Sequence, residues 1–141
     1  MMREGPHDAA SLRAWKERYG LTSGELAALC DVSLYTVHNW LKGRGWTWCW
    51  VRRALRDVGR SRALGEPFLA MTKEGEGSGE AFRAWRQDKG LTIRALSRML
   101  PASVDVLMRM NQGQHRLTII EARALRDLDR ELRRTQPRPP R

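Results

Sequence analysis

Cysteine and histidine are scarce in this sequence, which contains two cysteines and three histidines among 141 residues. Cys30 and Cys49 lack the paired spacing of a zinc site, and they are too few for a disulfide scaffold. No grouping of Ser, His and acidic residues and no Gly-rich phosphate loop is recognisable. We therefore expect no metal, no cofactor, no catalytic residues and no small-molecule substrate.

Long apolar runs are also missing. No stretch approaches the roughly 18 apolar residues that a membrane-spanning helix requires. The first ten residues, MMREGPHDAA, lack the apolar segment of a secretory signal peptide. The sequence therefore predicts a cytoplasmic protein without a membrane partner.

Acidic residues are outnumbered by basic ones. Lys and Arg number 26 against 16 Asp and Glu, which gives a formal net charge of +10. A basic excess of this size is typical of proteins whose partner carries phosphate groups. The alternative is that the charge serves solubility alone.

An internal repeat with a period of 70 residues organises the chain. Without a gap, RAWKERYGLT aligns with RAWRQDKGLT, and ALRDVGR aligns with ALRDLDR. Apolar character recurs at further pairs, such as Leu29 with Met99 and Trp50 with Ile120, which we expect in the core. One fold used twice explains this pattern better than chance.

The repeat divides the chain into an N-terminal domain over 1–60, a linker over 61–79, a C-terminal domain over 80–134 and a basic, Pro-rich tail over 135–141. The early linker sequence ALGEPFLAM is apolar enough to dock on a neighbour. The later sequence KEGEGSG is rich in Gly and charge, and it predicts a flexible segment.

Capping and turn residues predict short helices in each copy. In copy one, Gly20 ends a helix, Thr22 and Glu25 form a capping box, and Ser33 caps the next helix. Copy two repeats the plan with Ser103 as a cap, but it has Ala in place of the capping Glu. The helices predicted for copy one cover 9–19, 23–30, 33–42 and 47–58.

The segment GLTSGELAALCDVSLYTVHNWLKG resembles the helix-turn-helix of the phage repressor and Cro-like (XRE) family. The likeness lies in Leu-Ala on the first helix, a turn of small residues, and a Val five residues before a closing Lys-Gly. The resemblance implies an all-α fold of two tandem lambda-repressor-like helix-turn-helix domains, each with four to five short helices. It also implies that the second helix of the pair enters the major groove of double-stranded DNA.

Carried onto this chain, the resemblance places the outward side of helix 33–42 against DNA, because Val37, Trp40 and Leu41 point into the core. The Asn39 amide can pair with adenine, and Lys42 can reach guanine or phosphate. Hydroxyl and basic groups beside the helices suit phosphates. The DNA-binding residues predicted in copy one are Thr22, Ser23, Leu34, Tyr35, His38, Asn39, Lys42 and Arg44. The alternative is a helix face that is only solvated.

Copy two presents a different outward face. Arg109 and Gln112 suit base reading, whereas Asp105 would lie near phosphates. Val104 and Met108 resemble a protein contact more than a DNA contact. Copy two is therefore either a second DNA reader or a degenerate copy that pairs with another protein or another protomer.

The segment WTWCW contains three tryptophans. Trp46 and Trp48 align with polar residues of copy two, so at least one of them should lie at the surface, where exposed Trp commonly indicates a protein interface. The alternative is that they cover residues of copy one or the docked linker.

Two functions compete on these grounds. The first is a sequence-specific DNA-binding transcriptional regulator, a repressor of phage or mobile-element type, whose two reading heads act within one chain or in a homodimer. The second is a small phage-type inhibitor, of the anti-CRISPR or anti-polymerase class, that grips a protein or nucleoprotein machine with a helix-turn-helix scaffold.

Overall fold

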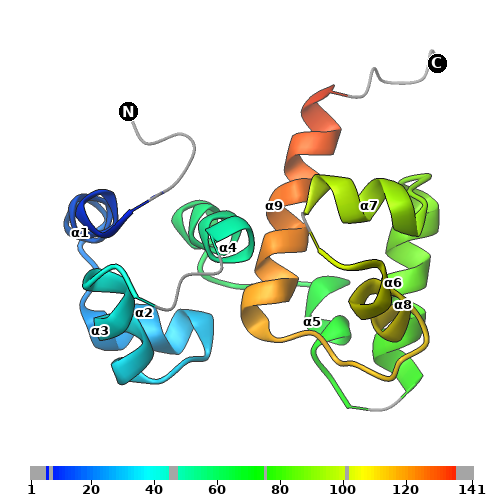
Figure 1. The fold of residues 1–141 in the computed structure, drawn as a ribbon, viewed down its shortest axis with the longest axis horizontal. Helices are drawn as coiled ribbons and strands as arrows, with labels where there is room; N and C mark the ends of the chain where they lie inside the picture. The colour runs from blue at the N-terminus through cyan, green and yellow to red at the C-terminus, as the bar shows by residue number, and fades with distance from the viewer. Residues whose placement is uncertain (1–5, 7, 45–47, 75, 101, 136–141) are drawn as a thin grey trace.

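The computed structural model describes residues 6, 8–44, 48–74, 76–100 and 102–135. These residues form nine α-helices and no strand, which confirms the all-α class (Figure 1). None of these helices is long and apolar enough to cross a membrane. The helices are α1 (Ala9–Arg18), α2 (Ser23–Cys30), α3 (Leu34–Leu41), α4 (Trp48–Arg60), α5 (Phe68–Met71), α6 (Glu76–Asp88), α7 (Ile93–Met99), α8 (Val104–Asn111) and α9 (Ile119–Thr135).

The 70-residue repeat is confirmed in the local structure. The shift carries α1, α2, α3 and α4 onto α6, α7, α8 and α9. The glycines at the ends of equivalent helices share a left-handed backbone, with φ of 65° at Gly20, 67° at Gly90, 79° at Gly43 and 73° at Gly113. Glycine adopts this conformation at little steric cost, so equivalent helices end at equivalent positions.

The predicted helix caps are present. The Thr22 hydroxyl accepts from the Glu25 N–H at 3.0 Å, and the Glu25 carboxylate accepts from the Thr22 N–H at 3.0 Å. The hydroxyls of Ser33 and Ser103 cap α3 and α8 in the same way. Each cap satisfies backbone donors that a helix start would otherwise leave unpaired.

The first helix of each copy holds the end of the third. A guanidinium N–H of Arg13 donates to the carbonyl of Leu41 at 2.5 Å. At the equivalent positions of copy two, Arg83 donates to the carbonyl of Asn111. These charge-assisted bonds occupy carbonyls at the C-terminal ends of α3 and α8, and they fix α1 and α6 against those helices.

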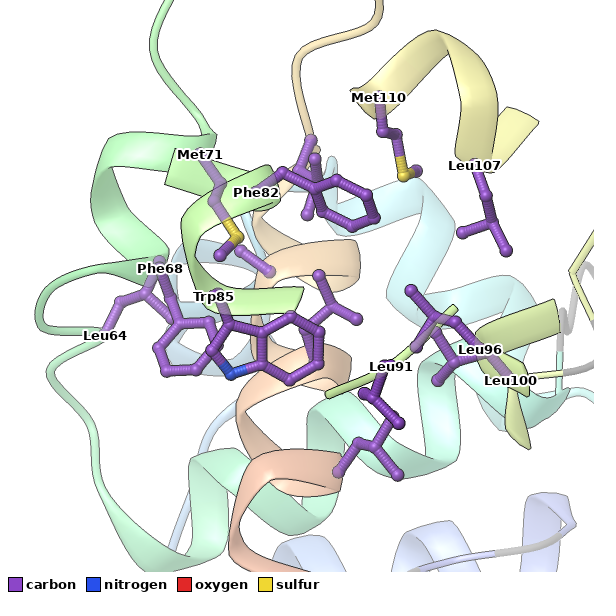
Figure 2. Packing of buried hydrophobic residues seen from close by; sticks show 14 residues of the cluster. Leu64, Phe68, Met71, Phe82, Trp85, Leu91, Leu96, Leu100, Leu107 and Met110 are labelled. Atoms are coloured by element: carbon purple, nitrogen blue, oxygen red, sulfur yellow. The ribbon is translucent and has the colours of Figure 1, made fainter. Parts of the chain in front are cut away.

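Each copy packs around its own apolar core. The first core contains Leu12, Trp15, Leu26, Val37, Trp40 and Leu55. The second core, drawn in Figure 2, contains Phe82, Trp85, Leu96, Leu100, Leu107 and Met110. In Figure 1, α1, α2 and α3 lie on one side of the pair formed by α4 and α9, and α5 to α8 lie on the other side.

The linker is largely structured. Leu64, Phe68 and Met71 belong to the second core, which confirms that the apolar part of the linker docks (Figure 2). The prediction of flexibility is wrong for 76–79, because α6 begins at Glu76. Gly79 is buried, and a Cβ added there would lie 2.6 Å from the backbone nitrogen of Gly113. Glycine at this position permits a close approach between α6 and the end of α8 rather than chain flexibility.

Replacing Gly79 by Ala should therefore destabilise the fold. The new methyl group would meet backbone rather than a movable side chain, so we expect a loss of about 1–3 kcal/mol, as for other overpacked sites. Gly77→Ala is the matched control, because no atom lies within 4 Å of its added Cβ. It should be neutral or stabilising by up to ~1 kcal/mol. Urea unfolding of both variants measures the difference, and equal effects would contradict the close-approach explanation.

Helices α4 and α9 form the most extensive helix contact of the described chain (Figure 1). The fully buried Asp57 carboxylate lies 2.8 Å from Nη1 of Arg123 and 2.6 Å from Nη1 of Arg130. The buried Asp127 carboxylate lies 3.1 Å from Nη1 of Arg53. Burial raises the pKa of Asp57, and the neighbouring guanidinium groups oppose that rise. Ion pairs with little solvent access thus join the two copies.

Three predicted core residues lie elsewhere. Met99 is exposed, because it lies on α7 away from the second core. Trp50 is half-buried and packs against the second core, although it belongs to copy one. Ile120 is half-buried and packs against the first core, although it belongs to copy two. Because α4 and α9 pack against each other, each of these two side chains reaches the core of the other copy.

Removing the Asp57 carboxylate should destabilise the whole protein. Asp57→Ala would leave the almost fully buried Arg123 without its acidic partner, and breaking a buried pair from one side typically costs about 3–5 kcal/mol. The control Asp88→Ala removes an exposed carboxylate from the end of α6, and its effect should stay within about 0.5 kcal/mol. Chemical denaturation measures both. A small loss for Asp57→Ala would show that the pair does not hold the copies together.

Candidate nucleic-acid interface

The candidate site is built on α2, α3 and the turn 31–33 between them. Asp31 ends α2 with a left-handed φ of 52°, which reverses the chain direction. Asp is one of the few residues other than Gly that adopts this conformation readily. Ser33 then starts α3. The turn is therefore short and locally specified, and α3 packs against both α1 and α2.

The inward and outward sides of α3 are largely as predicted. Val37 and Trp40 are buried, whereas Leu41 is half-buried. Tyr35 is 74% exposed and Leu34 is 47% exposed, although both are large apolar or aromatic side chains. Neither side chain is buried in the first core, so both are accessible to a partner.

The end of α3 carries the cationic side chains. Lys42 and Arg44 are exposed on either side of Gly43. The Arg44 N–H donates to the carbonyl of Asn39 at 2.7 Å, which turns the chain sharply after the helix. His38 is exposed and Asn39 is half-buried, so His38 is the more accessible of the two. The structure thus places an aromatic and polar face beside two cations.

The start of α2 offers less to a phosphate than the sequence predicted. The Thr22 N–H already donates to Glu25 within the capping box, and Ser23 is half-buried. A phosphate contact from the Thr22 backbone would therefore have to displace the Glu25 carboxylate. The Thr22 hydroxyl also accepts from the Glu25 N–H in the same box, so Ser23 is the less engaged of the two predicted residues.

Copy two presents a more apolar surface at the equivalent place. Leu107 and Met110 are buried as the spacing predicted. Met99, Val104 and Met108 are each more than a third exposed, and we call these three residues the apolar patch. Asp105 and Arg109 of α8 and the residue that follows this helix, Gln112, are also exposed. Sequence reasoning missed Met99 because its alignment with Leu29 indicated a core position.

The predicted tryptophan surface is not described by the structure. Trp46 lies outside the described residues, and of Trp48 only the backbone position at the start of α4 is described. A protein interface at these two residues stays a prediction.

Sequence reasoning also missed a groove between the two helix pairs. It has a volume of about 520 Å³, and we call it the central groove. Thr36 of α3 and Val106 of α8 face it from the two copies. The only sequence signal was that these two residues are equivalent in the repeat. The other lining residues are Val32, Trp40, Trp50, Val51, Ala102, Ser103, Thr118, Ile120 and Glu121.

Part of the basic excess is used inside the protein. Arg53, Arg56, Arg123, Arg126 and Arg130 all contact buried carboxylates between α4 and α9. The basic side chains that are available to an external partner therefore lie elsewhere, and they include Lys42 and Arg44 of copy one. Within the described ranges no group of His, Cys, Asp or Glu could hold a metal ion.

Comparison with known proteins adds no relative: no protein-family model, curated protein or solved structure matches this chain.

The two sides of α3 should respond differently to substitution. Tyr35→Ala removes a side chain that is 74% exposed and should change the unfolding free energy by less than about 0.5 kcal/mol. Trp40→Ala removes a side chain that is 2% exposed and should cost about 3–5 kcal/mol. Thermal and urea unfolding test both variants. A large loss for Tyr35→Ala would mean that this side chain serves the fold rather than a partner.

Proposed function

We propose that this chain is a DNA-binding protein of the helix-turn-helix class, with α2 and α3 as its reading unit. More particularly, we propose a sequence-specific transcriptional regulator, a repressor of phage or mobile-element type, that reads the major groove of double-stranded DNA with α3. The observation that carries the proposal is the outward face of α3. It exposes Leu34, Tyr35 and His38, while Val37 and Trp40 anchor the opposite side in the core.

The dimensions and chemistry of α3 support this proposal. A single α-helix fits the major groove, and residues early in a recognition helix contact base edges. Leu34 and Tyr35 lie in the first turn of α3, where they can pack on thymine methyl groups. The half-buried Asn39 can present its amide to adenine, and Lys42 with Arg44 can neutralise phosphates at the end of the helix.

The fold supports the proposal by holding α3 rigidly. Arg13 fixes the end of the helix, and Ser33 caps its start. A base-reading helix must keep its side chains in a defined position, because each hydrogen bond to a base depends on geometry.

A second candidate function rests on the apolar patch of copy two. Met99 and Met108 expose apolar surface where copy one has the half-buried Leu29 and the polar His38, whereas Val104 corresponds to the similarly exposed Leu34. This difference favours a protein contact in copy two, as a phage-type inhibitor of a protein or nucleoprotein machine would need. An inhibitor of that kind requires no specific DNA site, so DNA selectivity separates the two functions.

The test is fluorescence-anisotropy binding to duplexes enriched from a randomised pool, at two salt concentrations. The wild type should select a site. Asn39→Ala should lose about 1–3 kcal/mol of discrimination at one base pair while its salt dependence stays unchanged. Lys42→Ala should weaken binding to all duplexes alike and reduce the salt slope by about 1, because one phosphate contact is lost.

Arg18→Ala is the matched charge control. Arg18 is an exposed cation at the end of α1 rather than on α3. Its removal takes away one positive charge without removing a predicted phosphate contact, so selectivity and salt slope should stay unchanged. Unfolding curves confirm that each variant is folded. Weak binding without any selected site in the wild type would contradict the regulator and favour the inhibitor.

A further inference from the structure

The two copies contact each other through reciprocal ion pairs. Nη1 of Arg53 lies 3.1 Å from Oδ2 of Asp127, and Nη1 of Arg123 lies 2.8 Å from Oδ2 of Asp57. A shift of 70 residues converts Arg53 into Arg123 and Asp127 into Asp57, so one pair is the other with the copies exchanged. The contacting atoms are the same in both pairs.

A second set of ion pairs repeats this exchange. Nε of Arg56 lies 3.3 Å from Oδ1 of Asp127, and Nε of Arg126 lies 3.5 Å from Oδ1 of Asp57. These residues are again equivalent under the shift of 70. Two sets of contacts, both made to the carboxylates of Asp57 and Asp127, are thus reciprocal between the copies.

Apolar contacts follow the same rule. Trp50 of copy one packs against the second core, and its equivalent Ile120 of copy two packs against the first core. Ala54 and Ala124, also equivalent, are both fully buried although they belong to neither core. Small side chains at these two positions permit the close crossing of α4 and α9.

Reciprocal contacts of this kind define a two-fold rotation. In an isologous interface residue i contacts j and residue j contacts i, whereas a head-to-tail arrangement joins two different surfaces. The two copies of this chain are therefore related as the two subunits of a symmetric dimer are. They are not related as successive units of a direct repeat.

The central groove places both helix pairs on one side of this arrangement. It is bordered by the equivalent residues Thr36 and Val106 of α3 and α8, and by Val32 and Ala102 of the two turns. Both helices therefore lie on the same side of the contact between α4 and α9, and their outward residues lie outside the groove. Double-helical DNA has local two-fold symmetry itself, which suits a pair of helices related by a rotation.

We propose that one chain binds one inverted repeat in DNA as a built-in pair, with α3 on one half-site and α8 on the other. This inference rests on the proposed function. The half-sites should differ in sequence, because the outward residues differ: His38 and Asn39 of α3 correspond to Met108 and Arg109 of α8. The recognised site is thus an imperfect palindrome read by a single chain rather than by a homodimer.

The experiment starts from duplexes selected by the full-length protein from a randomised pool. The selected sites should contain two inverted half-sites, and native mass spectrometry should find one chain per duplex. Asn39→Ala should relax selection in one half-site, and Arg109→Ala should relax it in the other. Each half-site alone should bind at least tenfold more weakly than the complete site.

Spacing variants test whether the two copies are rigidly paired. Inserting ~5 or ~10 base pairs between the two half-sites, which is half a helical turn or one full turn, should lower the affinity of the protein for the duplex at least tenfold. Recovery at the full turn would show flexibly tethered copies and overturn the proposal. Two chains per site, a direct repeat, or a single selected half-site would also overturn it while leaving DNA reading intact. The absence of any selected site would contradict the proposed function itself, and this inference with it.

Discussion

Two carboxylates held out of water between α4 and α9 determine how the molecule is assembled. Asp57 and Asp127 each receive guanidinium groups from the opposite copy. An isolated charge at such a position would cost several kcal/mol, so neither carboxylate is tolerable without its partners. Each copy has only about 55 residues, a size at which a single core is marginal. The pairing of α4 with α9 gives each copy a second buried surface.

Buried ion pairs contribute little net stability compared with apolar side chains of similar size, but they define geometry closely. A guanidinium group donates in a fixed plane, so a carboxylate between two of them accepts few alternative positions. A purely apolar crossing of α4 and α9 would tolerate sliding by a turn. Such sliding would break the pairs at Asp57 and Asp127, because each carboxylate lies within 3.5 Å of its guanidinium partners.

The local structure was predictable from the sequence because its causes are local. Gly20, Thr22 and Ser33 end or start helices through their own backbone and side-chain chemistry, and copy two confirmed the reading of copy one. The outward positions of α3 followed from helical periodicity. The exposure of these residues is therefore known, whereas their contacts with DNA stay a prediction.

What could not be predicted depends on contacts between distant residues. Trp50 and Ile120 have the apolar character of core residues, but periodicity cannot say that each enters the core of the other copy. The start of α6 at Glu76 was missed because glycines suggested flexibility, whereas Gly79 is required by the proximity of Gly113. The shared sequence ALRD was noticed as a repeat. Its charges form an interface because α4 and α9 pack against each other, which the repeat alone does not reveal.

The continuous chain between α4 and α6 has a consequence for dosage. Leu64, Phe68 and Met71 pin this connection to the second core, so the two copies are always present at a high effective concentration. Two separate subunits must first meet, and their paired form then grows with the square of their concentration when they are rare. In a single chain the paired form grows in simple proportion to the number of molecules. Such a protein would act without an assembly threshold, from the first molecules that a cell makes.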